Sequence, residues 1–158
     1  MSDTNTVVYT DASYVIRELN LQQSTTDPTQ YYVWLIPTSV DTINQFVLQA
    51  NEYATALWGD LTSNETSFKL ARQYATKLAS LRLLQEQALN WQISGMQMGL
   101  GNLTISRLNA LERALKEVKQ RLMEDLNKIY TLLSEVEMHN NYQPRNIYEV
   151  THGSMYWG

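Results

Sequence analysis

A run of leucine, isoleucine and valine residues between positions 108 and 136 constrains the fold of this chain more than any other feature. These residues follow one another at intervals of three or four: Leu108, Leu111, Leu115, Val118, Leu122, Leu126, Ile129, Leu132, Leu133 and Val136. Such spacing places apolar side chains on one face of an α-helix. Glutamates four residues before a base support the same helix: Glu112–Lys116, Glu117–Arg121 and Glu124–Lys128. We therefore expect a helix over about 106–138, roughly 50 Å long at 1.5 Å per residue.

This apolar stripe has two structural explanations. It is either the core-facing side of a long bundle helix or the seam of a coiled coil. The spacing departs from a strict heptad after Leu122, which favours packing against the chain's own helices over a long two-stranded coil. A module that dimerises through 108–136 remains the alternative.

Two helices are expected in the first third of the chain. Thr10 is a suitable N-cap for a short amphipathic helix over 11–20, and Asp11 adds favourable charge in its first turn. A second helix over 40–58 follows Thr38 or Ser39 as its cap. It ends at Gly59, where a left-handed C-terminal residue is common.

Regular apolar spacing from Phe68 to Leu84 predicts a third helix over about 66–93. Gly95, Gly99 and Gly101 follow within seven residues, and this density of glycine is expected to end the helix. Residues 21–38 form a long connection. Its apolar part, Tyr31 to Ile36, is either a short strand ended by Pro37 or an extended segment packed on the core.

These elements predict an all-α fold, a small bundle of about four helices with a long C-terminal helix. The length of 158 residues suits one domain, assigned to 1–138, and the chain has no cysteine to staple it. Residues 139–158 lose the helical pattern and are expected to form an extended tail. The tail is rich in aromatic and apolar groups, which we expect to bind a protein surface: Tyr142, Pro144, Ile147, Tyr148, Val150, Tyr156 and Trp157. Docking on its own domain and clipping onto a neighbouring subunit both remain open.

Charge is distributed unevenly along the chain. Residues 1–65 hold one base and eight acids, a net charge of −7, whereas residues 66–158 hold eleven bases and eight acids, a net charge of +3. Such polarity suits front-to-back packing of copies. The acidic total argues against tight nucleic-acid binding, since no basic stripe with interleaved aromatics appears. No apolar run is long enough to span a membrane and no signal peptide is evident, so we expect a soluble protein made in the cytoplasm.

The sequence contains no pattern typical of catalysis. The two histidines, His139 and His152, have no carboxylate at metal-ligand spacing, and no Glu-x-x-His motif of di-metal bundles occurs. The three glycines near position 98 lack the Lys-Ser/Thr of a phosphate loop. We expect neither an enzyme, nor a cofactor, nor a metal site.

The order of the features resembles the head–tail connector (adaptor) proteins of tailed viruses of bacteria and archaea. The similar pieces are a short helix after Tyr9-Thr10-Asp11-Ala12, a helix from Ile43 to Gly59, and an Ala/Tyr/Leu-rich helix from Phe68 to Leu89. A turn, Gly101-Asn102-Leu103-Thr104-Ile105-Ser106, then leads to a long final helix. Together they cover about residues 7–138, and Asn102 stands where the family usually has Asp.

The resemblance implies a virion structural protein of the neck. Such adaptors form a homo-oligomeric ring of about twelve copies beneath the portal protein, with unlike faces of neighbouring copies in contact. The ring continues the channel through which DNA passes without sequence-specific binding, and it presents a platform to the next neck or tail protein. Extended termini reach onto neighbouring copies, which is the role expected here for the aromatic tail.

Overall fold

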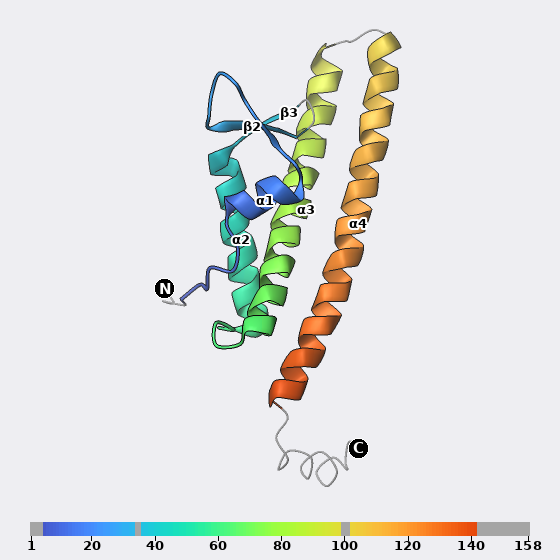
Figure 1. Ribbon diagram of the computed structural model, residues 1–158. Helices are drawn as coiled ribbons and strands as arrows, with labels where there is room; N and C mark the ends of the chain where they lie inside the picture. The colour runs from blue at the N-terminus through green and yellow to red at the C-terminus, as the bar shows by residue number, and fades with distance from the viewer. Residues whose placement is uncertain (1–4, 34–35, 99–101, 142–158) are drawn as a thin grey trace.

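The computed structural model describes residues 5–33, 36–98 and 102–141, and this part of the chain is mostly helical (Figure 1). It contains four helices and three short strands, in the order α1 (Ala12–Glu18), β1 (Gln22–Gln23), β2 (Gln30–Val33), β3 (Ile36–Ser39), α2 (Val40–Trp58), α3 (Glu65–Met98) and α4 (Asn102–Asn141). The prediction of an all-α bundle of about four helices with a long C-terminal helix is confirmed. The candidate tail residues from Tyr142 to Trp157 lie outside the described residues.

Helix α3 is the centre of the bundle. It lies between α2 and α4, and α1 packs across it (Figure 1). Its buried residues point in all directions around its axis and include Ala71, Tyr74, Ala75, Thr76, Leu78, Ala79, Ser80, Leu81, Leu83 and Leu84. A helix that is buried around most of its circumference must be surrounded by other elements. The regular apolar spacing of α3 in the sequence therefore belongs to a helix with only a narrow exposed face.

The leucine stripe of α4 faces α3 within the same chain. Its buried members are Leu115, Leu122, Leu126, Ile129 and Leu133, while Val118 is partly buried against the same core. Burying one such side chain is worth about 1.5–3 kcal/mol. Leu132 departs from the expected pattern, since 50% of its surface is exposed. It follows Ile129 by three residues but lies on the flank of the helix.

The ends of α3 and α4 differ from the predicted bounds. Helix α3 runs through Gly95 and ends at Met98, five residues past the predicted end near 93 but within the glycine-rich stretch 95–101 that was expected to end it. One glycine in a helix costs only about 1 kcal/mol relative to alanine, so a single Gly95 need not end α3. Helix α4 begins at Asn102 and continues to Asn141. Residues 139–141, assigned to the tail, are therefore helical.

Helix α1 is capped by Asp11, whereas the sequence predicted Thr10 as the cap. The Asp11 carboxylate accepts a hydrogen bond from the Ser13 amide at 2.8 Å. Thr10 is unavailable for this role because its hydroxyl is buried and lies 2.6 Å from the hydroxyl of Thr76 on α3. Helix α2 matches its prediction, with Ser39 as N-cap and Gly59 at a positive φ of 68° as C-cap.

The connection before α2 forms a three-stranded antiparallel sheet in the order β1-β2-β3. The sequence predicted one strand at most and placed its end at Pro37. In the structure Pro37 lies within β3, opposite Tyr32 of β2. Strand β3 is an edge strand, where a residue without an N–H is tolerated. Strand β1 consists of two exposed glutamines, which carry no apolar alternation that could predict it.

Candidate interaction surfaces

The segment before α1 is fixed to α2 by one buried side chain. The side-chain oxygen of Asn51 accepts hydrogen bonds from the Tyr9 and Thr10 amides, each at 3.0 Å. Its side-chain NH₂ donates to the Thr10 carbonyl at 3.1 Å. One asparagine therefore satisfies three backbone groups that would otherwise be buried without partners. These bonds position α1 against α2 and α3.

The side chain of Tyr9 ties the same segment to the turn after α2. Its hydroxyl donates to the Gly59 carbonyl and accepts from the Leu61 amide at 3.0 Å. Its ring lies 5.3 Å from the ring of Phe68, centre to centre. Burial raises the pKa of the Tyr9 phenol, while the hydrogen bond from Leu61 opposes that rise. Asn51 and Tyr9 thus both hold the segment, together with the Thr55 hydroxyl, which accepts from the Val7 amide at 3.0 Å.

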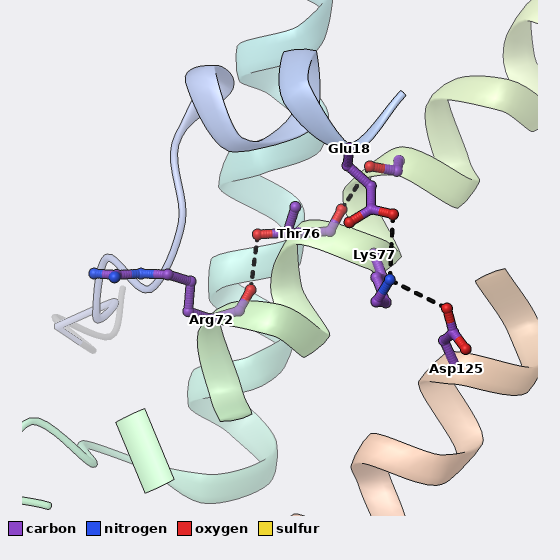
Figure 2. Close-up of polar contacts among 6 residues, drawn as sticks. Glu18, Arg72, Thr76, Lys77 and Asp125 are labelled. Carbon is purple, nitrogen blue, oxygen red and sulfur yellow. Dashed lines mark hydrogen bonds and ion pairs between the residues drawn. The ribbon is translucent and has the colours of Figure 1, made fainter. Parts of the chain in front are cut away.

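Lys77 on α3 joins three helices. Its ammonium lies 3.2 Å from Glu18 on α1 and 3.1 Å from Asp125 on α4 (Figure 2). Only 18% of the Lys77 side chain is exposed, so this pair of contacts is less screened than a surface ion pair. The contact fixes α1 across the groove between α3 and α4.

A groove with positive charge lies between α1 and α3 on this side of the bundle. Its volume is roughly 500 Å³, and we call it the cationic groove; its lining residues are Tyr14, Arg17, Glu18, Lys69, Arg72, Gln73, Thr76 and Lys77. The ring of Tyr14 lies 5.3 Å from the Arg17 guanidinium carbon and 4.9 Å from that of Arg72. Arg72 also donates through Nε to the Tyr9 carbonyl at 2.9 Å, and Figure 2 shows its side chain directed away from Lys77. Two guanidinium groups on one ring form a surface suited to carboxylate-bearing partners.

Lys69 and Lys77 contribute less net charge to this groove than the arginines do. Lys69 is paired with Glu65 at 3.0 Å, and Lys77 is paired with Glu18 and Asp125. Within the described residues, no carboxylate lies at ion-pair distance from either arginine. The unneutralised charge of the groove is therefore that of Arg17 and Arg72.

Several acids of the first half of the chain are exposed. They include Asp11, Asp41, Glu52 and Asp60. The pKa of Asp60 is lowered by hydrogen bonds from the Thr62 hydroxyl and amide, so this carboxylate remains charged well below neutral pH.

Four aromatic rings meet where α2, α3 and α4 adjoin, and we call them the aromatic cluster: Tyr53, Trp58, Tyr74 and Tyr130. Trp58 contacts Tyr74 edge-on at 4.9 Å between ring centres and Tyr130 at 5.7 Å. Tyr53 stacks beside Tyr74 at 6.5 Å. Burial raises the pKa of the Tyr74 phenol. The outer two rings remain open, with 44% of Tyr53 and 45% of Tyr130 exposed.

Further apolar groups extend this cluster into a patch. Leu57 on α2 and Met123 on α4 are both exposed, and Met123 precedes Tyr130 by two helical turns. Arg82 places its guanidinium carbon 5.7 Å from the centre of the Tyr53 ring. Contiguous exposed apolar side chains of this kind mark sites of protein contact more often than isolated ones do.

The two surfaces lie on opposite sides of α3. Arg72 lines the cationic groove and Tyr74 belongs to the aromatic cluster. Residues two apart on an α-helix are rotated by about 200° around its axis. One helix therefore separates a charged surface from an aromatic one.

In the part of the chain that the structure describes, no group of three or more histidine, aspartate or glutamate side chains is placed to hold a metal. None of the described helices combines the length and apolar character needed to cross a bilayer. What both surfaces provide is contact area, charge and aromatic rings.

The sequence did not predict these surfaces. Every predicted site residue belongs to the tail and lies outside the described residues, while His139 falls within α4. The aromatic cluster has only a weak sequence signal, since Tyr130 follows Ile129 directly and departs from the leucine stripe. The cationic groove joins Arg17 and Arg72, which lie 55 positions apart in the chain.

No protein-family model, curated protein or solved structure matches this chain.

Proposed function

We propose that this chain is a virion structural protein of the neck, which forms a homo-oligomeric ring between the portal of the capsid and the tail and acts without catalysis. The order of sequence features supports the proposal. A short helix after Thr10-Asp11, a helix ending at Gly59, an Ala/Tyr/Leu-rich helix and a long final helix follow one another as in the adaptor proteins that the sequence resembles. In this role the ring binds the portal protein on one side and a neck or tail protein on the other.

The observation that carries the proposal is the pair of unlike surfaces on opposite sides of α3. Closed rings form through heterologous contacts, in which one face of a subunit meets a different face of the next. The cationic groove, with Arg17 and Arg72, suits an acidic face of a neighbour, and exposed acids such as Asp41 and Glu52 are available for it. The aromatic cluster supplies a second, separate contact.

The alternative, a module that dimerises through 108–136, is less well supported. The leucines required for a coiled-coil seam are already buried in the chain's own core, including Leu115, Leu122 and Leu133. A dimer through this stripe would have to remove α4 from α3 and expose that core to water. The cost would be several times the roughly 1.5–3 kcal/mol of a single buried leucine.

Charge reversal in the cationic groove tests the proposal. Arg17 is exposed, so Arg17→Glu alters the groove with little effect on folding. Lys128→Glu makes the same charge change on an exposed position of α4 away from the groove and serves as the control. Sedimentation at low salt is expected to show assembly weakened at least tenfold by Arg17→Glu alone, with the difference shrinking at high salt. Equal assembly of both variants would contradict a role for the groove, and a wild-type chain that never assembles would contradict the ring.

A further inference from the structure

We propose that the aromatic cluster is the docking site for the C-terminal segment, residues 142–158, of a neighbouring copy. This docking site rests on the proposed function, because it requires that copies associate through unlike surfaces. It adds the identity of one contact: the segment is the donor, and the cluster on α2, α3 and α4 is the acceptor.

The place where the segment leaves the described fold supports this assignment. Helix α4 ends at Asn141, and its last turns lie beside the start of α3, where the Ser67 hydroxyl donates to the Glu137 carboxylate. This is the same end of the bundle as the aromatic cluster, since Tyr130 is eleven residues, or about 16 Å of helix, before Asn141. Seventeen residues follow Asn141 in the chain. The segment thus begins close to a surface of matching chemistry.

The chemistry of the segment matches that of the cluster. It holds three tyrosines and a tryptophan, with Ile147, Val150 and Met155 among them, and its one base and one acid cancel. The cluster offers exposed rings, and its cation, Arg82, already lies over Tyr53. Aromatic side chains gain from packing against other rings, and they anchor many protein interfaces.

The length of the segment allows its last aromatic residues to reach a neighbouring copy. A chain returning to its own Tyr130 needs to cover only about 16 Å, which about five extended residues achieve. The strongest anchors, Tyr156 and Trp157, come fifteen and sixteen residues after Asn141. Those positions can reach up to about 50 Å from the helix end. Such a reach exceeds the distance to the chain's own cluster about threefold and is sufficient to cross onto an adjacent bundle.

Two full-length variants and a matched control isolate the contact. The donor variant is Tyr156→Ser/Trp157→Ser, and the acceptor variant is Tyr53→Ser/Tyr130→Ser. The control, Leu48→Ser/Leu132→Ser, removes two exposed apolar side chains from the same two helices outside the cluster. Circular dichroism confirms that each variant keeps its helices before association is compared.

The first experiment is a titration with a labelled peptide of residues 142–158. The peptide is expected to bind the donor variant saturably, to bind at least tenfold more weakly when the acceptor substitutions are added, and to be unaffected by the control substitutions. Absence of binding, or equal losses in the acceptor and control backgrounds, would overturn the docking site whether or not the chain forms rings. Saturable peptide binding without any wild-type ring would instead contradict the proposed function and leave the docking site standing.

The second experiment mixes the donor and acceptor variants. Each retains one half of the contact, so the mixture is expected to form a one-to-one heterodimer that neither variant forms alone. A mixture that stays monomeric while the peptide still binds would show docking within one chain and would overturn the assignment to a neighbour. Wild-type-like rings formed by both variants would also overturn it.

Discussion

The two sides of helix α3 differ in how far their side chains are satisfied within the chain. On the side of α1, polar and aromatic groups are satisfied inside the chain, as when Thr76 bonds Thr10 and Lys77 bonds two carboxylates. On the opposite side, Tyr74 contacts rings whose outer edges remain exposed. The first side holds α1 and the segment before it in place. The second side stabilises the fold little, because the outer edges of its rings remain in water.

This difference indicates where selection for folding and selection for contact act. Polar groups that are buried must find partners within the chain, so their positions are strictly determined. Exposed rings have no such requirement. The four substitutions below are ordered from the largest expected effect to the smallest, and each compares a position that holds the fold with one that does not.

A charge placed between α3 and α4 is expected to have the largest effect. Leu115 is buried, and Leu115→Asp puts a carboxylate into an apolar core without a partner. We expect loss of helical circular dichroism and of the cooperative thermal transition. Leu132→Asp, at an exposed leucine of the same helix, is the control and is expected to melt close to wild type. Similar melting of both variants would mean that the leucine stripe is not a core face.

Removal of the Asn51 amide is expected to come next. Asn51→Ala leaves the Tyr9 and Thr10 amides and the Thr10 carbonyl without their partner, at a cost of about 2–4 kcal/mol. Urea unfolding measures this loss. Asn44→Ala, the same substitution at an exposed position of α2, is expected to change the free energy of unfolding by less than about 0.5 kcal/mol. If both variants lost the same amount, the segment before α1 would not depend on Asn51.

The Tyr9 hydroxyl is expected to contribute about 1 kcal/mol through its bonds to Gly59 and Leu61. The raised pKa of the Tyr9 phenol also predicts the direction in which stability changes with pH. In the unfolded chain the phenol releases its proton near pH 10, before the folded state does. Its contribution is therefore complete below about pH 10 and is lost as the pH rises through the higher folded value. Above about pH 10, the free energy of unfolding should fall less steeply with pH in Tyr9→Phe than in the wild type. The same slope in both proteins would contradict a raised pKa for Tyr9.

The smallest effect on folding is expected on the aromatic side. Tyr53 is 44% exposed, and Tyr53→Ser removes a ring that packs on one face only. We expect the free energy of unfolding of the monomer to fall by about 1 kcal/mol or less, measured by urea titration at low protein concentration. A loss as large as that of Asn51→Ala would mean that the cluster supports the fold and would remove the contrast between the two sides.

The sequence was sufficient to predict the elements with strong periodicity. Both caps of helix α2, Ser39 and Gly59, are residue types typical of helix ends, and the observed bounds match the predicted ones. The stripe of α4 was correctly placed against the chain's own helices because its spacing slips from a heptad. These signals are local, so they do not depend on what the rest of the chain does.

Features that depend on distant residues were missed. Thr10 has a side chain suited to an N-cap, but its hydroxyl is hydrogen-bonded to the hydroxyl of Thr76. Asp11 caps α1 instead. Helix α3 was expected to end near residue 93, but it continues through Gly95 to Met98. The aromatic cluster draws its rings from three helices, which no local pattern could bring together.

The ring is the central claim, and native mass measured over a series of protein concentrations tests it most directly. We predict a closed assembly of about a dozen copies, a single species with no open intermediates at high concentration. A dimer that persists at every concentration and survives Tyr156→Ser/Trp157→Ser would contradict it and favour the coiled-coil module. A monomer throughout the series would contradict self-assembly through the two surfaces of α3.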